Sequence, residues 1–408
     1  MKDVPKVAPV APSIGAVIAL LRERIRPIGN RAARSAQAVA ALHTLAIEWQ
    51  EDLSKNWLPP EESAFPWQQI EPSLRRFLSD LQNLSAYGKP QLAPEDAPCI
   101  VGLILAGNTP LAGYPAIVAA LVAGHAIFAK LSRDETVWIP VLADRLRRID
   151  LEVAQRLYFD IWQGTDPRSA ELVQSVDAVI AYGSDTTIAA IRDATPKVTP
   201  LYGFGHSISV ALLPQGASLT ENAAAIARDT LTFRQQGCLS PQAVFVEGDP
   251  VRAHAAARAI AAAMPETAER LAVSAVTEPA IAIPVRQARD LAAFAGAEVR
   301  GDAGLRWSIF AYPETIPVPA PVGWGVLPVI PVASLETDLS ELLEPLRGRV
   351  SAVGASLPLS ATIADYLHDL GVTYVCPFGE MQTPPLTWAN AGCDLFRELM
   401  GLPSSEKS

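Results

Sequence analysis

From residue 99 onwards, short apolar segments alternate with amphipathic helical segments, and no other feature of the sequence constrains the fold as strongly. The segments CIVGLILA, AIFAKL, RLYFDIW, DAVIAYG and SISVALL have the composition of buried strands. Continuous apolar strands joined by helices of about 10–15 residues are typical of parallel sheets that carry helices on both faces. The sequence therefore predicts an α/β fold built on a doubly wound parallel sheet.

Helical segments precede this alternation, and a second α/β region follows it. The spacing of apolar residues over 13–56 predicts two helices, and a third is expected in PSLRRFLSDLQNLSAYG. A later helical segment leads to Cys238, and the strand-like PQAVFVEG then begins a further series of helices and strands. We therefore expect N-terminal helices with a dinucleotide-type domain (1–215), a catalytic-type domain (216–375) and a C-terminal segment (376–408) that returns to the interdomain or oligomer region.

Charge and cysteine content disfavour several classes of function. The chain has 33 basic and 43 acidic residues, a net charge of −10, which disfavours general binding to nucleic acid or to an anionic membrane. The four cysteines form no CxxC pair and the five histidines are scattered, so no metal site is expected. The N-terminus lacks the pattern of a secretory signal, and we expect a cytoplasmic protein whose thiols stay reduced.

The most apolar stretch, residues 100–131, is not predicted to cross a membrane. Asn108, Pro110, Pro115 and His125 interrupt it, and no uninterrupted run reaches the ~20 residues that a membrane span needs. A buried β-α-β unit explains this stretch better.

Ligands of doubly wound sheets bind at the carboxyl ends of the strands, so the residues that follow each strand form the candidate site. The candidates are Asn108, Lys130, Ser132, Arg133, Gly183 and Ser184. The last two stand where a helix begins, and free backbone N–H groups at such a position favour a phosphate. The GxGxxG fingerprint is absent. Each candidate also fits an ordinary cap, turn or solvated charge, and Cys238 taken alone fits a buried small side chain equally well.

Taken in order, AGNTP, AKLSR, AYGSD, YGFGHSISV and RQQGCLSPQ resemble the motif series of the aldehyde dehydrogenase superfamily. That superfamily carries N-x-P, K-P-S/A-E, F-T-G-S, E-L-G-G-K and G-Q-x-C in the same order. The forms GN-x-P, KLS, FGH and Q-x-C-x-SPQ are more similar to the LuxC-type fatty acyl thioester reductases, as is VTYVCPFGEMQTPPLTW. The resemblance covers residues 99–398. It implies an aldehyde-dehydrogenase-like fold with N-terminal helices, a doubly wound cofactor-binding domain and an α/β catalytic domain.

The resemblance implies a role for each matching residue of the catalytic motifs. Cys238 matches the catalytic nucleophile. Asn108 matches the amide that forms an oxyanion hole with the Cys238 backbone N–H. His206, in the FGH motif, is a candidate for lowering the pKa of the thiol or for donating a proton, with a purely structural histidine as the alternative.

The other matching residues concern a nicotinamide cofactor. Lys130, with Ser132 in the same motif, matches the lysine that contacts the adenosine ribose. Gly183 and Ser184 match the turn beside the pyrophosphate. Arg133 stands where the superfamily has the acidic residue that binds the ribose hydroxyls of NAD. A cation at this position suits a 2′-phosphate, so we expect NADPH, with NADH as the alternative.

A second departure concerns the base that activates water in hydrolytic aldehyde dehydrogenases. The glutamate of E-L-G-G-K falls on Tyr202, so no carboxylate stands there. A thioester reductase has no need of this base, because a thiol rather than water attacks or leaves. The missing carboxylate therefore favours thioester chemistry over acid formation.

The expected function is NADPH-dependent reduction of an acyl thioester, carried by CoA or an acyl carrier protein, to an aldehyde through a cysteine-bound acyl-enzyme. We also expect a homo-oligomer and a partner enzyme that consumes the aldehyde. Two alternatives stay open. An acyl-phosphate reductase would use the same cysteine, although the SPQ and FGH forms favour a thioester. A non-catalytic scaffold subunit is opposed by the joint presence of Cys238 and Asn108.

Overall fold

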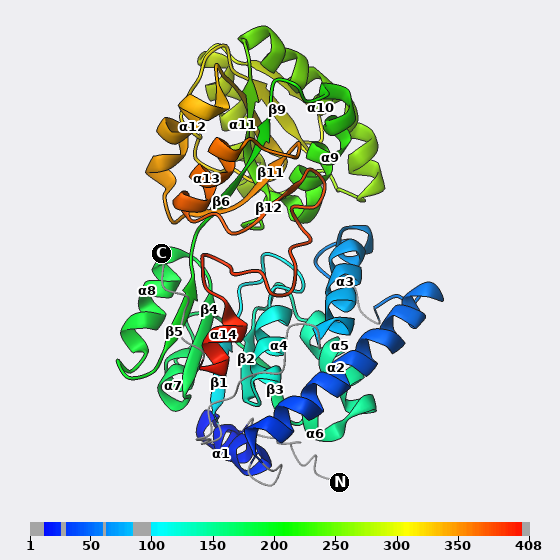
Figure 1. The fold of residues 1–408 in the computed structure, drawn as a ribbon, viewed down its shortest axis with the longest axis vertical. Helices are drawn as coiled ribbons and strands as arrows, with labels where there is room; N and C mark the ends of the chain where they lie inside the picture. The colour runs from blue at the N-terminus through cyan, green and yellow to red at the C-terminus, as the bar shows by residue number, and fades with distance from the viewer. Residues whose placement is uncertain (1–11, 26–29, 60–62, 85–98, 402–408) are drawn as a thin grey trace, which may run out of the picture.

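Two largely parallel sheets organise the protein, one in each half of the molecule (Figure 1). The computed structural model describes residues 12–25, 30–59, 63–84 and 99–401. The first sheet has five parallel strands in the order β3-β2-β1-β4-β5. Its strands are β1 (Ile100–Ile104), β2 (Ala126–Leu131), β3 (Leu157–Ile161), β4 (Ala178–Tyr182) and β5 (Leu201–Phe204).

Helices cover both faces of the first sheet, as the predicted doubly wound arrangement requires. One face packs against α2 (Arg31–Ser54), α3 (Trp67–Gln82), α4 (Tyr114–Val122), α5 (Trp138–Ile149) and α6 (Leu151–Ala154). The other face packs against α1 (Ile14–Ile25), α7 (Arg168–Ser175) and α8 (Asp185–Ala194). Because successive strand residues point to opposite faces, Val101 and Leu103 enter the first core, whereas Ile100 and Ile104 enter the second.

The second sheet has seven strands in the order β12-β11-β6-β7-β10-β9-β8. They are β6 (Ile208–Leu213), β7 (Pro241–Glu247), β8 (Glu298–Gly301), β9 (Ser308–Ala311), β10 (Val326–Val332), β11 (Val350–Ala355) and β12 (Val375–Pro377). Only the edge strand β8 runs antiparallel to its neighbour among these strands.

Helices again cover both faces of this sheet. One face carries α9 (Leu219–Leu231) and α10 (Pro250–Arg270). The other carries α11 (Pro279–Phe294), α12 (Leu335–Leu343) and α13 (Ala361–Leu370). Two short 3₁₀ turns, η2 (Thr232–Gln235) and η3 (Glu344–Leu346), follow α9 and α12.

The boundary between the two halves lies earlier in the chain than the sequence suggested. We expected residues 1–215 to form the first domain, with the SISVALL strand in its sheet. Instead, the first sheet ends with β5, and β6 lies between β11 and β7 in the second sheet. The chain crosses from one half to the other over residues 205–207, between these two strands. The composition of an apolar strand does not show which sheet it joins, because its neighbours in the sheet come from distant parts of the chain.

The C-terminal segment returns from the second half to the first. After β12 it runs between the two halves and ends in α14 (Leu395–Met400), which packs against α4 (Figure 1). The backbone N–H of Leu386 donates to Asp80 Oδ2 of α3 over 2.7 Å, and the Ser73 hydroxyl donates to the carbonyl of Gln382 over 2.8 Å. These contacts tie the segment to the N-terminal helices.

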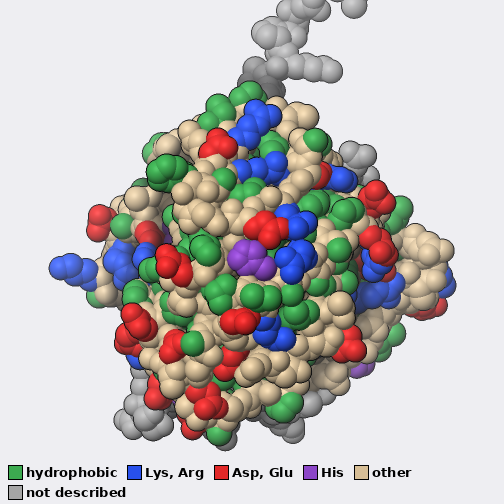
Figure 2. Space-filling view, turned by 90° about the horizontal axis from the view of Figure 1, so that it is seen from above, with side chains coloured by type: hydrophobic (Ala, Val, Ile, Leu, Met, Phe, Trp, Pro, Cys, Tyr) green, Lys and Arg blue, Asp and Glu red, His purple; other side chains and the backbone are tan. Residues whose placement is uncertain are grey.

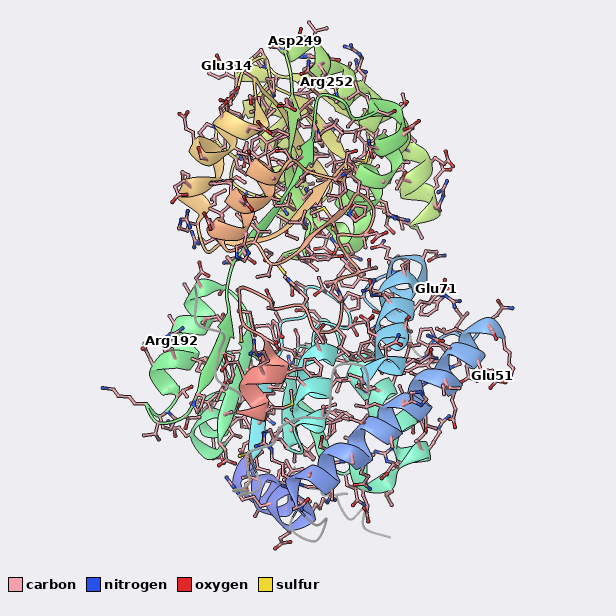
Figure 3. All side chains as sticks on the ribbon, viewed as in Figure 1. Glu51, Glu71, Arg192, Asp249, Arg252 and Glu314 are labelled. Atoms are coloured by element: carbon pink, nitrogen blue, oxygen red, sulfur yellow. The ribbon has the colours of Figure 1, made fainter. Side chains whose placement is uncertain are left out.

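Charged side chains are dispersed over the surface. On the face in Figure 2, acidic, basic and apolar side chains are interspersed without a patch of one sign. The charged residues labelled in Figure 3, such as Glu51 on α2 and Arg192 on α8, point outward from the periphery of the two halves. None of the described helices is both long and apolar enough to cross a membrane.

Candidate active site

The carboxyl edge of the first sheet meets a loop of the second half that carries the predicted nucleophile. We call residues 232–240 the cysteine loop. Asn108, in the turn that follows β1, donates its side-chain amide to the backbone carbonyl of Gln236 over 2.9 Å. Gln236 lies two residues before Cys238. The structure therefore brings together the two residues that the sequence assigned to the nucleophile and the oxyanion hole.

The cysteine loop begins with an unusual left-handed turn. Helix α9 ends at Leu231, and the next turn places Phe233, Arg234 and Gln235 at φ values of 54°, 55° and 57°. Left-handed backbone costs a non-glycine residue about 1 kcal/mol or more, so three in succession need support from their surroundings.

Hydrogen bonds from three directions supply that support. Gln69 of α3 accepts the N–H of Phe233 at 2.8 Å. The carbonyl of Arg234 accepts the N–H of Trp324 at 2.8 Å. The Gln235 side chain donates to the carbonyls of Pro241 and Val326 at 2.7 and 2.9 Å. The loop is thus held by the N-terminal helices and by the second sheet together.

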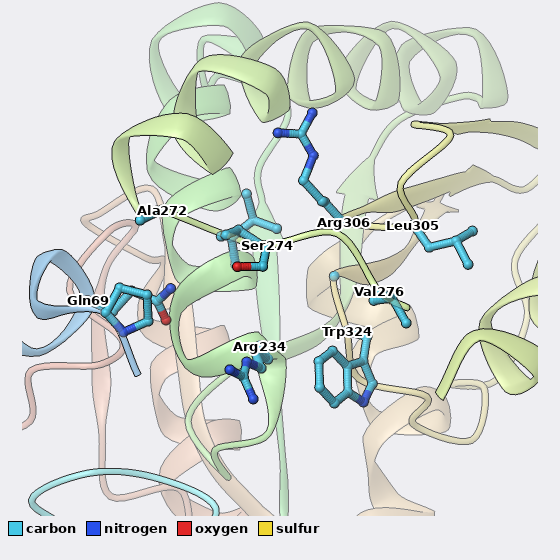
Figure 4. A pocket seen from close by; sticks show the side chains of 12 residues that line it. Gln69, Arg234, Ala272, Ser274, Val276, Leu305, Arg306 and Trp324 are labelled. Carbon is cyan, nitrogen blue, oxygen red and sulfur yellow. The ribbon is translucent and has the colours of Figure 1, made fainter. Parts of the chain in front are cut away.

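The guanidinium of Arg234 completes this brace. It lies 5.3 Å from the ring of Phe65 and 5.4 Å from that of Trp324, and it donates to the carbonyl of Ala64. Figure 4 shows Gln69, Arg234 and Trp324, from three separate parts of the chain, lining one small pocket beside the turn. Cation–π contacts of this kind stabilise a fold by about 0.5–1 kcal/mol each at accessible sites.

Two serine hydroxyls contact the sulfur of Cys238. Dense packing around this partly accessible cysteine raises the pKa of its thiol, and hydrogen bonds from Ser351 and Ser207 act in the opposite direction. The two hydroxyls lie 2.6 Å from each other. Burial raises the pKa of the Tyr182 phenol at the end of β4, and a charge on Cys238 adds to this shift. Among the described residues, no carboxylate and no cation contributes to the pKa of Cys238.

The C-terminal segment also reaches the cysteine loop. Gln382 donates its amide to the Ser240 hydroxyl over 3.0 Å. A Cβ built at Gly237 would lie 3.1 Å from Cγ2 of Thr109 and 3.5 Å from Oε1 of Gln382. The loop is therefore enclosed between the turn that follows β1 and the C-terminal segment. The sequence motif GEMQT matched the family, but no local pattern indicated that its glutamine touches the loop.

A cavity of about 300 Å³ lies next to Gln382, between α3, the end of α9 and the C-terminal segment. Arg76, Arg228, Asp229 and Thr383 are among the residues that line it. Asp229 is only 1% exposed, and burial raises the pKa of its carboxyl to about 7. Its oxygens accept the backbone N–H groups of Gly379 and Met381, which hold the C-terminal segment in place.

On the cofactor side, Lys130 and Arg133 differ in their surroundings. Lys130, in β2, is 6% exposed, and burial lowers the pKa of its ammonium group. Arg133 is exposed, and hydrogen bonds from Arg168, with a smaller contribution from the charge of Arg133, lower the pKa of Asp166. Neither cation forms an ion pair within the part of the chain that the structure describes. The Ser132 hydroxyl donates to Asp134 Oδ2. A Cβ at Gly107 would clash with the same hydroxyl, so the segment that contains Ser132 packs closely on the turn after β1.

Gly183 and Ser184 stand at the start of α8, as expected from the sequence. Ser184 caps the helix by accepting the N–H of Thr187 at 3.2 Å. A Cβ at Gly183 would lie 2.9 Å from Cγ2 of Thr187, so the close turn requires glycine. The first helical residue is Asp185, a carboxylate that pairs with Arg349 at 2.8 Å.

His206 contacts the other oxygen of the Asp185 carboxylate. Its backbone N–H donates to Asp185 Oδ1 over 2.8 Å, and its ring nitrogen Nδ1 lies 4.0 Å from the same oxygen. The side chain is 73% exposed. His206 is not among the groups that shift the pKa of Cys238, so the structure does not place it as the activator of the thiol.

Tyr202 occupies the position of the missing base and points to the C-terminal helix. Its hydroxyl donates to Glu398 Oε2 over 3.4 Å, and burial raises the pKa of the phenol to about 12. The carboxylate of Glu398 is thus engaged by Tyr202 and does not contribute to the pKa of Cys238.

Sequence reasoning missed three groups of this site: Ser207, Ser351 and Gln382. Ser207 directly follows the FGH motif, so its position was a usable signal. Ser351 and Gln382 belong to strands and turns far along the chain, and only the strand order brings them to the cysteine. No cluster of three or more His, Cys, Asp or Glu side chains suited to a metal occurs among the described residues.

Comparisons with known proteins identify the family and the fold of the chain. The model of the family described as acyl-CoA reductase (LuxC) matches residues 73–396. The chain is 24% identical over 152 residues to the long-chain acyl-protein thioester reductase 2 of Photobacterium leiognathi, which covers 36% of this chain and 32% of that protein. It is 26% identical over 152 residues to the long-chain acyl-protein thioester reductase of Photorhabdus laumondii, with 36% and 31% covered. The matched region spans about a third of the length of these relatives.

Solved structures with the same fold are aldehyde dehydrogenases. A putative aldehyde dehydrogenase from Burkholderia cenocepacia superposes with a TM-score of 0.73 at 15% identity, covering 96% of this chain and 90% of that one. An aldehyde dehydrogenase from Bacillus cereus, solved as its NAD+ complex, gives a TM-score of 0.68 at 17% identity, with 89% and 80% covered. At these identities the similarity establishes an aldehyde-dehydrogenase-like fold and nothing finer.

Proposed function

Since the chain belongs to the acyl-CoA reductase (LuxC) family, we propose that it reduces an acyl thioester to an aldehyde through an acyl-enzyme on Cys238, with NADPH as the reductant. The observation that carries this proposal is the surroundings of the cysteine. Asn108 bonds the loop two residues before Cys238, two hydroxyls contact the sulfur, and no carboxylate of the described residues acts on it.

The first half of the reaction is acyl transfer to the enzyme. The Cys238 sulfur attacks the thioester carbonyl, and the Asn108 amide with the Cys238 backbone N–H binds the oxyanion that forms. One such donor lowers the barrier by about 3–4 kcal/mol. The C–S bond of the substrate then breaks, the thiol of the carrier leaves with a proton, and the acyl group stays on Cys238.

The second half is reduction. NADPH, held by Lys130, Arg133 and the turn at Gly183 and Ser184, would supply the hydride that reduces the acyl group. The resulting thiohemiacetal on Cys238 breaks its C–S bond, releasing the aldehyde and the thiol. Asn108 stabilises the oxygen in this half as well, and His206 stays the candidate for proton donation to it. Because Tyr202 replaces the water-activating glutamate and its hydroxyl bonds Glu398, the acyl-enzyme is protected from hydrolysis.

The residues that would hold the cofactor fit an anionic dinucleotide. Lys130 is a buried cation without an ion pair among the described residues, at the carboxyl end of β2 where a ribose hydroxyl would bind. Arg133 is an exposed cation, also unpaired among those residues, that suits a 2′-phosphate. Gly183 and Ser184 would place the start of α8 beside the pyrophosphate. Asp185 at that helix start is neutralised by Arg349.

The proposal extends to domains and partners. The half up to β5 would bind the cofactor, the half from β6 would supply the nucleophile, and the C-terminal segment would close the site between them. The acyl carrier would be CoA or an acyl carrier protein in a homo-oligomeric, cytoplasmic enzyme that passes its aldehyde to a partner.

The test is to trap the acyl-enzyme. Incubating the protein with an acyl-CoA in the absence of NADPH should add the mass of one acyl group to the peptide that contains Cys238. Cys238→Ala should lose both this adduct and NADPH oxidation, yet retain NADPH binding by fluorescence titration. Acylation by an acyl phosphate but not by an acyl-CoA would replace the thioester proposal, and normal turnover of Cys238→Ala would reject a cysteine mechanism.

A further inference from the structure

The reactivity of the Cys238 sulfur depends on which groups around it stabilise the thiolate. Only the thiolate attacks a thioester, and the packing around Cys238 disfavours that form. In catalytic cysteines, a nearby cation or a helix N-terminus usually stabilises the thiolate. Here the residue precedes strand β7 rather than a helix, and no cation of the described residues contributes at the sulfur.

The charged groups on the neighbouring elements are engaged elsewhere. His206 directly precedes Ser207, and Arg349 lies two residues before Ser351, so both stand close to the serines in sequence. Each of these two side chains faces Asp185 instead of the sulfur. Tyr182 at the end of β4 is a buried, neutral phenol, and burial is the main cause of its raised pKa. The two serine hydroxyls are therefore the polar side-chain groups that act directly on the thiol.

A β-bulge aims Ser351 at the cysteine. Strand β11 pairs in parallel with β6, and its register shifts between Val350, opposite Ile208, and Ala352, opposite Ser209. Ser351 is thus the extra residue of the bulge. Bulges frequently re-aim a side chain next to an active site. The Ser351 side chain is turned towards Ser207, whose hydroxyl lies 2.6 Å away, and towards Cys238.

A third serine connects the same bulge to the cysteine backbone. The fully buried Ser209 donates its hydroxyl to the carbonyl of Cys238 over 2.6 Å and accepts the N–H of Ala352 at 3.0 Å. Ser209 therefore fixes the position of the Cys238 backbone relative to the bulge of β11. Ser209 contacts the Cys238 backbone, whereas Ser207 and Ser351 contact its sulfur.

We propose that Ser351 and Ser207 form a proton relay that carries the thiol proton of Cys238 outward to the departing thiol and that stabilises the sulfur by hydrogen bonding once its proton has left. This role rests on the proposed function, in which Cys238 attacks a thioester. Each hydroxyl has one donor hydrogen and can accept another, so the pair can reverse its direction of donation. Ser351 is 2% exposed and Ser207 is half-buried, which makes Ser351 the inner and Ser207 the outer member.

The proton balance is complete without a charged base. As the Cys238 sulfur bonds to the acyl carbon, its proton moves to Oγ of Ser351, and the Ser351 proton moves to Oγ of Ser207. The Ser207 proton passes to the sulfur of the departing thiol, whose bond to the acyl carbon breaks. Both serines end in their starting state, and one proton has moved from the enzyme thiol to the carrier thiol.

The test measures the pH dependence of Cys238 alkylation by iodoacetamide, read by mass spectrometry of the Cys238 peptide. Ser207→Ala and Ser351→Ala should each shift the midpoint upward by about one unit and slow alkylation at pH 7 about tenfold, while the rate at high pH is retained. This magnitude follows from hydrogen bonds to a charged group. Ser207→Thr keeps the hydroxyl and should retain the wild-type profile. Ser360→Ala is the control, since it removes an exposed serine that caps α13 and lies outside the site.

An unchanged midpoint in either alanine variant would overturn the relay. Because Ser207 is half-buried, Ser207→Ala decides the question by itself if Ser351→Ala does not fold. The alkylation profile needs neither acyl substrate nor cofactor. Its outcome is therefore separate from that of the acyl-enzyme experiment. A shifted profile without acyl-enzyme formation would reject the proposed function, whereas an acyl-enzyme with unshifted profiles would reject the relay alone.

Discussion

The side-chain amide of Asn108 donates to the backbone carbonyl of Gln236 over 2.9 Å, across the boundary between the two halves of the protein. This bond places the amide two residues before Cys238 and holds the cysteine loop against the turn that follows β1. Binding of a thioester would give the amide a second acceptor, the developing oxyanion. The same hydrogen bond therefore links the positioning of the loop to the stabilisation of the transition state.

Replacing Asn108 by alanine should lower kcat for acyl-CoA reduction by about 100- to 1000-fold, since one oxyanion donor is lost. The measurement is steady-state NADPH oxidation with a fixed acyl-CoA. Iodoacetamide alkylation of Cys238 serves as the control and should change little, because Asn108 does not contact the sulfur. A kcat within threefold of the wild type would remove Asn108 from the oxyanion hole.

Replacing Arg133 by alanine should raise KM for NADPH about 10- to 100-fold, because a charge-assisted contact to the 2′-phosphate is lost. KM for NADH, which lacks that phosphate, should stay unchanged. Both values come from initial rates at a saturating acyl-CoA concentration. If the wild-type enzyme uses NADH and NADPH with equal kcat/KM, Arg133 has no such role.

Replacing Gly237 by alanine should lower kcat/KM about tenfold, because the new Cβ would lie 3.1 Å from Cγ2 of Thr109 and push the cysteine loop out of position. Adding Thr109→Ser, which removes that methyl group, should restore most of the loss in the double variant. A double-mutant cycle on kcat/KM checks the coupling. Additive losses would mean that the two residues do not press on each other.

The buried carboxyl of Asp229 should make stability depend on pH. Its pKa is raised to about 7 in the folded protein, above the ordinary value of 3.8, mainly by burial. The folded state therefore keeps a proton that the unfolded chain releases between these values. This contribution is fully present below pH 3.8 and is lost as pH rises through 7, on the order of 4 kcal/mol in total.

Urea unfolding of the wild type and of Asp229→Asn at a series of pH values from 5 to 8 tests this expectation. As pH rises, the unfolding free energy of the wild type should fall relative to that of the variant, because asparagine does not titrate. Parallel curves for the two proteins would show that Asp229 keeps an ordinary pKa.

Much of the architecture was predictable from periodicity alone. The alternation of apolar strands and helices predicted a doubly wound parallel sheet followed by a second α/β region, and the structure has one such sheet and a second, largely parallel sheet with helices on both faces. The assignment of the SISVALL strand to the first sheet was wrong, because β6 pairs with β11 and β7. The antiparallel edge strand β8 was also missed. Pairing partners and strand direction depend on contacts between distant segments, and local composition does not encode them.

For the site, the residue types and their order were readable from the sequence: Asn108 follows one strand, Lys130 lies near the end of another, Cys238 lies between a helix and a strand, and no carboxylate stands at Tyr202. The groups that surround the sulfur depend instead on how distant strands pair in the folded chain. Ser207 and Ser351 are 144 residues apart, and their hydroxyls meet because β6 and β11 are neighbours and a bulge shifts the register at Ser351. A bulge changes which face a side chain occupies without leaving a periodic signature, so this pair became visible only in the folded chain.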